Sequence, residues 1–269
     1  MIAASAATVL YVYGIVGADA ADDVEREVAS AALGQTPRLL RAGSLAALVS
    51  EVPLAEFGAD VLPERLNDRD WLEERVQAHE DVLEAALART TVIPFRFGAI
   101  YHGNGDVARM LGERRRELEE ALERVRGRVE LGVKAYVDRQ LLEERLRSAS
   151  REASSEGAGA GRAYLLGRQA ERRVVAEADE ACAAAIAEAH ERLSAIAVDA
   201  RVNRPQPREL SGRPEQMLLN GAYLVERGDS RIESEVESLR TAYRGLGIAF
   251  ELTGPWPPYN FVDDEEAAA

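Results

Sequence analysis

Runs of apolar residues with the two-residue period of a strand alternate with runs that have the 3.6-residue period of a helix. In the first half of the chain the strand-like runs are Thr8–Val16, Arg38–Ala42, Leu45–Val52 and Thr91–Phe97. Gly43-Ser44 predicts a hairpin turn between the second and third of them. Helices are predicted from Asp22 or Asp23 to about Leu33, and from Asp68 to Arg89 with Asn67 as the cap. This β-α-β-β-α-β order is typical of a ferredoxin-like domain.

A third helix is predicted from about Gly105 to Arg126, and after it the same order recurs. The predicted strands are Val129–Asp138, Val198–Asn203, Met217–Glu226 and Ile248–Thr253. The predicted helices are Arg139–Ser150, Ala163 to about Ile196, and one opened by the capping box Ser230–Glu233 that continues to about Leu246. The Ser/Gly/Ala-rich stretch Ser154–Gly161 is typical of a linker. Asn220-Gly221 could form a tight turn, but we favour one continuous strand there.

The pattern therefore predicts an α+β protein with two ferredoxin-like (βαββαβ) domains and additional helices. We expect an N-terminal domain over residues 1–103 and a connecting helix over 104–127. A second domain, with a helical insertion after its first strand, is expected over 128–262. Residues 263–269 are expected to form an acidic disordered tail.

Charge narrows the possible partners. The chain has 47 acidic and 33 basic residues and a net charge of −14, which argues against nucleic acid and against an anionic membrane surface. One cysteine allows no internal disulfide. The first residues lack a basic segment and a span-length apolar run, so we expect no signal peptide, no membrane span and a cytoplasmic location.

The most informative stretch is Gly254–Val262, with sequence GPWPPYNFV. Proline lacks an N–H donor and fixes φ, so we expect a stiff, extended, polyproline-like segment that holds aromatic rings in set positions. The segment is either a latch that packs on its own protein across an interdomain groove or a contact for a partner. The candidate residues for either role are Pro255, Trp256, Pro257, Pro258, Tyr259 and Phe261.

Other candidate residues have simpler interpretations. His79 lies on the apolar face of its predicted helix, and with Arg96 it is a possible buried polar site, although a satisfied core histidine is the commoner case. Cys182 falls on an apolar stripe and is expected to be a small core residue. Gly103-Asn104-Gly105 precedes a helix but lacks the residues of a phosphate loop. We find no catalytic constellation and expect no enzyme activity, cofactor or metal.

Several motifs resemble those of one family, the gas vesicle proteins of the L/F type (GvpL/GvpF). These motifs, in order along nearly the whole chain, are YVYGIV (11–16), VIPFRFG (92–98), ELGVKAYV (130–137), GRAYLL (161–166), LNGAYLV (219–225) and LTGPWPPYNF (252–261). The last is the most specific. Lys134, the only lysine of the chain, falls inside one of them.

The resemblance implies a minor structural or accessory protein of gas vesicles. Such a protein is expected to bind the main shell protein and other gas vesicle accessory proteins. It is also expected to aid the nucleation and assembly of the vesicle without aggregation. The resemblance also implies a two-domain fold with ferredoxin-like elements and no known catalytic residues. The alternative is a small-molecule-binding regulatory module, with His79, Arg96 and Tyr136 lining a site between paired domains, which rests on analogy with the fold.

Overall fold

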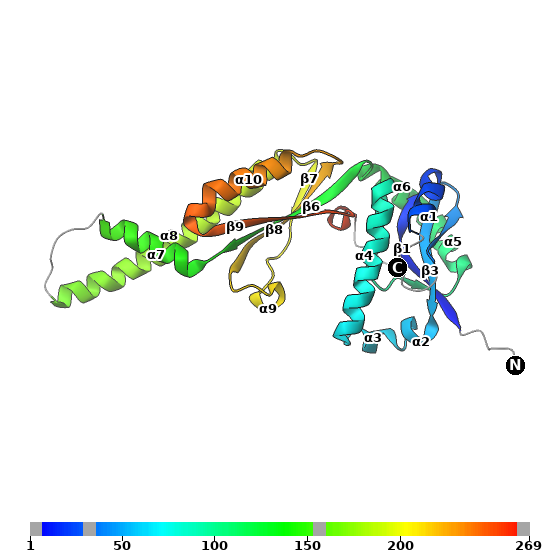
Figure 1. Ribbon diagram of the computed structural model, residues 1–269, viewed down its shortest axis with the longest axis horizontal. Helices are drawn as coiled ribbons and strands as arrows, with labels where there is room; N and C mark the ends of the chain where they lie inside the picture. The colour runs from blue at the N-terminus through cyan, green and yellow to red at the C-terminus, as the bar shows by residue number, and fades with distance from the viewer. Residues whose placement is uncertain (1–6, 29–35, 153–159, 263–269) are drawn as a thin grey trace. The chain divides into compact units, whose positions relative to one another are not determined.

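The computed structural model describes residues 7–28, 36–152 and 160–262 (Figure 1). The chain forms two compact units, the first made of Met1–Glu130 with Pro255–Ala269 and the second of Leu131–Gly254. Each unit contains an antiparallel sheet with the strand order of a ferredoxin-like fold, as predicted.

The sheet of the first unit has the order β2-β3-β1-β4, and a short strand, β5, also pairs with β1. The strands are β1 (Thr8–Gly17), β2 (Arg38–Ala42), β3 (Leu45–Pro53), β4 (Val92–Pro94) and β5 (Ile100–Tyr101). Every residue of the central strand β1 from Val9 to Val16 is buried. Burial on both faces of the strand explains why its sequence is continuously apolar instead of alternating. Its register with β3 shifts between Val12 and Gly14. A Cβ atom on Gly14 would lie 2.5 Å from the carbonyl oxygen of Ile93, so the close approach of β4 requires glycine.

Six helices accompany this sheet in the described residues. They are α1 (Ala21–Glu27), α2 (Leu54–Phe57), α3 (Leu62–Arg65), α4 (Arg69–Arg89), α5 (Asn104–Glu113) and α6 (Arg115–Arg124). Helix α4 contacts α1 and the strands β1 and β4, whereas α5 packs against β2 and β3 and α6 against β1 and β4. In Figure 1, α4 and α5 flank β1 and β3 on opposite sides. The segment expected as a connector, 104–127, is therefore part of the first unit.

The sheet of the second unit has the order β7-β8-β6-β9, although residues 128–130 of β6 and 255–256 of β9 are counted with the first unit. Its strands are β6 (Arg128–Val137), β7 (Asp199–Val202), β8 (Gln216–Glu226) and β9 (Ile248–Trp256), and its helices are α7 (Arg139–Glu152), α8 (Ala160–Ser194), α9 (Arg208–Ser211) and α10 (Arg231–Tyr243). Strand β8 is continuous through Asn220-Gly221, as we favoured. Helix α8 buries Ala178, Cys182, Ala185, Ala189 and Leu193, so the interpretation of Cys182 as a small core residue is confirmed.

The structure corrects several local predictions in the first unit. Asp68, not Asn67, caps α4, because its carboxylate accepts the amide of Trp71 at 3.3 Å. The predicted helix 105–126 is two helices that meet at Arg114. The strand expected to reach Phe97 ends at Pro94, so Arg96 lies outside the sheet. Short helices such as α2 and α3 were not predicted, because four residues are too few to show a period.

Two further corrections concern the second half. The capping box at Ser230 does not form; instead the Asp229 carboxylate accepts the amide of Arg231 at 3.0 Å. The closing run is extended only to Trp256, where it completes the edge strand β9, and Tyr259–Phe261 is a 3-10 turn. A proline is tolerated in β9 because an edge strand leaves some amides unpaired. Most of the predicted linker, 154–159, and the acidic tail, 263–269, lie outside the described residues.

Candidate functional site

The closing segment, defined here as residues 255–262, belongs to the first unit and is partly buried in it. Its buried residues are Pro257, Pro258, Phe261 and Val262, whereas Pro255 is exposed and Trp256 is 39% exposed. The six candidate residues of the closing segment therefore fall into two groups. The C-terminal group packs on the protein itself, and Pro255 and Trp256 remain accessible.

Side chains from distant parts of the first unit hold the closing segment by hydrogen bonds. Glu130 is buried, and its two carboxylate oxygens accept the backbone amide of Asn260 at 2.8 Å and its side-chain amide at 2.6 Å. The Arg124 guanidinium donates to the carbonyl oxygen of Phe261 at 3.3 Å. A carboxylate that accepts two hydrogen bonds from the same residue fixes the orientation of that residue. The Glu130 carboxylate therefore fixes the position of Asn260.

His79 lies at the centre of a buried polar network beneath this segment. Its Nε2 atom is 3.1 Å from the carbonyl oxygen of Phe95, and a carbonyl can only accept, so Nε2 carries the proton. Its Nδ1 atom then accepts the hydroxyl of Tyr11 at 2.7 Å. The Tyr259 hydroxyl lies 3.2 Å from Nε2 and donates to the Glu80 carboxylate at 2.9 Å. The histidine is thus a satisfied, neutral core residue that also contacts the closing segment.

Burial governs the protonation states in this network. It lowers the pKa of His79 from 6.5 to about 4, because the charged imidazolium would lose its hydration, while the bond to Phe95 acts in the opposite direction. Burial also raises the pKa of the Glu80 carboxyl and of the Tyr11 and Tyr259 hydroxyls. Near neutral pH both tyrosines therefore keep the protons that they donate.

An aromatic cluster extends from this network toward the surface. The Tyr11 ring lies 5.8 Å from those of Phe57 and Phe97, and the Trp71 ring lies 5.4 Å from Phe57 and 6.3 Å from Phe97, measured between centroids. Tyr11 and Phe57 are fully buried, whereas Trp71 and Phe97 are half-buried. Such tilted and edge-to-face contacts add to the stabilisation from area burial and make the cluster a firm support for the surface above it.

The other predicted polar residues do not gather around His79. Arg96 follows β4 and is exposed. Tyr136 belongs to the second unit, where the Arg213 guanidinium lies 4.6 Å from its ring centroid. Within neither unit does the structure bring His79, Arg96 and Tyr136 into one site. Gly103 occupies the N-cap position of α5 and Asn104 is its first residue, whose side chain accepts a hydrogen bond from Arg38.

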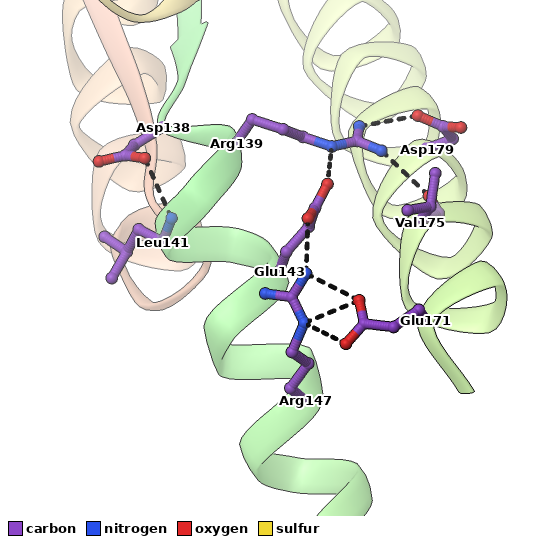
Figure 2. Close-up of polar contacts among 8 residues, drawn as sticks. All are labelled: Asp138, Arg139, Leu141, Glu143, Arg147, Glu171, Val175 and Asp179. Atoms are coloured by element: carbon purple, nitrogen blue, oxygen red, sulfur yellow. Dashed lines mark hydrogen bonds and ion pairs between the residues drawn. The ribbon is translucent and has the colours of Figure 1, made fainter. Parts of the chain in front are cut away.

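In the second unit, a ladder of ion pairs joins α7 to α8 (Figure 2). Glu143 lies between Arg139 and Arg147, at 2.9 Å from each. Arg139 also pairs with Asp179 at 2.7 Å and donates to the carbonyl of Val175, and Arg147 pairs with Glu171 at 3.1 Å. The hydrogen bond from Arg139, followed by that from Arg147, lowers the pKa of Glu143. These contacts set the register of the helix pair and offer no reactive group.

Sequence reasoning singled out His79 and Tyr259 but missed Glu80, the partner of Tyr259, and Glu130, the partner of Asn260. Glu80 follows His79 directly in the sequence, and this position beside a residue of the apolar face was the available signal. Glu130 lies within the predicted strand Val129–Asp138, and nothing in that pattern indicates that its carboxylate is buried. Among the described residues no group of three or more His, Cys, Asp or Glu side chains could hold a metal ion. In the same residues no helix is long and apolar enough to cross a membrane.

Comparisons with known proteins agree with the motifs. The family described as gas vesicle synthesis protein GvpL/GvpF matches residues 9–263. Gas vesicle protein L of Streptomyces sp. (strain CB03234) is 38% identical over 90% of this chain and 88% of its own length. Gas vesicle protein F of the same strain is 31% identical over 94% and 99%.

Solved structures share the fold. The crystal structure of the gas vesicle protein GvpF from Anabaena sp. PCC7120 aligns with a TM-score of 0.68 at 20% identity, over 95% of this chain and 96% of that one. GvpF from Microcystis aeruginosa aligns with a TM-score of 0.63 at 19% identity, over 95% and 99%. The chain belongs to the GvpL/GvpF family of gas vesicle proteins.

Proposed function

We propose that this protein is a non-catalytic accessory protein of gas vesicles in the cytoplasm. It binds the main shell protein, keeps that protein soluble and aids nucleation and assembly of the shell. The observation that carries the proposal is the family match over residues 9–263.

The physical properties of the chain fit such a role. A shell subunit that is very apolar needs a charged escort, and a net charge of −14 supplies solubility. An escort also needs a limited apolar surface. Leu54 and Leu66, with exposed fractions of 41% and 43%, provide one in the first unit.

Strand addition at the β2 or β7 edge is the less favoured mode of binding. In the edge strand β2, the amide of Leu39 already donates to the Glu25 carboxylate at 3.3 Å. In the edge strand β7, the amide of Ala200 donates to the Asp199 carboxylate at 2.8 Å. Carboxylates that occupy main-chain donors reduce the ability of an edge to accept another strand.

The test is co-expression of this chain with the main shell protein from its own gene neighbourhood, followed by size-exclusion chromatography. We expect the shell protein to move from the pellet into a soluble complex. A matched control replaces this chain with an unrelated acidic protein of similar charge, which should leave the shell protein in the pellet. Shell protein that stays insoluble while this chain elutes alone contradicts the proposal.

A further inference from the structure

One end of the first unit exposes apolar side chains beside the aromatic cluster. It consists of α2, α3 and the first turns of α4, which lie together in Figure 1. Of the large apolar side chains that are exposed in the described residues, both leucines, Leu54 and Leu66, are found here. Half-buried Val61, Leu62 and Trp71 lie in the same segment. We name these five residues the leucine surface.

Hydrogen bonding at this end is incomplete. Within the part of the chain that the structure describes, two buried side-chain nitrogens lack a partner, Nε1 of Trp71 and Nε of Arg75. Both belong to the first turns of α4, where the Trp71 ring contacts Phe57 and the Arg75 guanidinium lies 3.8 Å from Glu56 of α2. Unsatisfied buried donors are uncommon in folded proteins, and these two occur together in the part of α4 that adjoins α3 in the chain.

The segment that carries the leucine surface is acidic. Residues 54–75 contain seven acidic and three basic side chains, a net charge of −4. Three of the acidic residues, Glu64, Asp68 and Asp70, are exposed close to Leu66 in the sequence. A second copy of this chain, with its net charge of −14, would be repelled, whereas a partner with basic residues would be attracted.

The contacts of these short helices position the leucines firmly. The amide of Leu62 donates to the carbonyl of Gly58 at 2.9 Å, and that of Leu66 to the carbonyl of Leu62 at 3.0 Å. The Trp71 ring of this surface contacts the buried ring of Phe57, which in turn contacts Tyr11 in the aromatic cluster. The leucine surface therefore combines exposed apolar side chains on hydrogen-bonded helical turns with acidic residues close by in the sequence.

We propose that the leucine surface is a docking site for an amphipathic helix that has an apolar face and basic flanking residues. Two helices pack when the side chains of one fit between those of the other. An incoming helix would contact the leucine surface with apolar side chains at positions i, i+3, i+4 and i+7. The acidic residues of this segment select for lysine and arginine on the flanks of the incoming helix. That the helix belongs to a gas vesicle shell subunit rests on the proposed function; the docking site itself does not.

The test uses the full chain and a synthetic peptide of about 18 residues, roughly five helical turns, made of leucine on one face and lysine on the other. The chain has two tryptophans, so a Trp256→Phe background leaves Trp71 as the only indole and makes its emission a local reporter. We expect a saturable shift of this emission. The same peptide with glutamate in place of lysine should bind at least about tenfold more weakly, and added salt should weaken the binding of the lysine peptide.

Two variants locate the site. Leu54→Glu combined with Leu66→Glu should weaken binding of the lysine peptide at least about tenfold, while Val202→Glu should not. Val202 is a matched control, since it is 55% exposed and lies in β7 of the second unit. All three positions are exposed, so the variants should fold, which circular dichroism checks. No saturable shift, equal binding of the two peptides, or unchanged binding to the double variant would overturn the proposal.

A parallel capture of the shell protein separates this inference from the proposed function. If the peptide binds at the leucine surface but the wild-type chain does not solubilise the shell protein, the docking site stands and the proposed function falls. If the wild-type chain and the double variant solubilise the shell protein equally well, the proposed function stands and the leucine surface is not the site.

Discussion

The neutral state of His79 predicts a specific loss of stability in mild acid. The pKa of His79 is about 4 in the folded chain and about 6.5 in the unfolded one, so between these values the unfolded state binds the additional proton. The contribution of His79 to the free energy of unfolding is therefore fully present above pH 6.5 and is lost as the pH falls toward 4. For this pair of pKa values, linkage gives a loss of about 2 kcal/mol between pH 7 and pH 5.

The assay compares the wild-type residue with His79→Gln, which keeps a donor and an acceptor but cannot titrate. Urea unfolding of both proteins is followed from pH 7 to pH 5 by Trp71 emission in the Trp256→Phe background, which reports on the first unit. The variant should be less stable at pH 7, because its side chain fits the Tyr11 and Phe95 contacts less well.

The difference in unfolding free energy between the two proteins should shrink by about 2 kcal/mol at pH 5. Burial raises the pKa of Glu80, so that carboxyl contributes in the opposite direction as the pH falls, but it is present in both proteins and cancels in the comparison. A difference that stays constant from pH 7 to pH 5 would refute the reasoning, because it would mean that His79 titrates alike in the folded and unfolded states.

Three more predictions follow from packing and charge. Phe261→Ala should cost about 3–5 kcal/mol, as for a buried aromatic residue, and Trp256→Ala distinctly less because of its exposure; equal losses in urea unfolding would contradict this. Gly14→Ala should lose about 1–3 kcal/mol by overpacking against a backbone carbonyl, whereas Gly112→Ala, with open space around its Cβ, should melt at the same or a higher temperature. Glu143→Gln should cost no more than about 1 kcal/mol, and the loss should diminish at high salt; a loss independent of salt would argue against an ion-pair origin.

The fold could be predicted because its signals are local and repeated. Hydrophobic period and turn residues identified the eight strands of two βαββαβ units, and both sheets have the expected strand order. Choices between neighbouring polar residues, such as Asn67 and Asp68 as the cap of α4, depend on backbone geometry that either residue permits. The length of β4 depends on pairing with β1, which a period within Thr91–Phe97 does not record.

The candidate site was less accessible to sequence reasoning. The composition of the closing run predicted a segment that packs on its own protein or on a partner. Its hydrogen-bond partners Glu80 and Glu130 are more than a hundred residues earlier in the chain. Side-chain pairs at such separations leave no pattern in one sequence. The same holds for the leucine surface, because Leu54 and Leu66 read as ordinary apolar positions until their exposure is known.

The distance in sequence between Glu130 and its partner Asn260 has a consequence for synthesis on the ribosome. The second unit, Leu131–Gly254, comprises 124 residues that are translated between the two parts of the first. At about 5–20 residues per second, this takes roughly 6–25 s. During that interval the nascent first unit has Glu130 without Asn260 and Glu80 without Tyr259. The part of the protein that is translated first is thus completed last, and a premature stop that removes only the closing segment would leave the earliest-made unit unfinished.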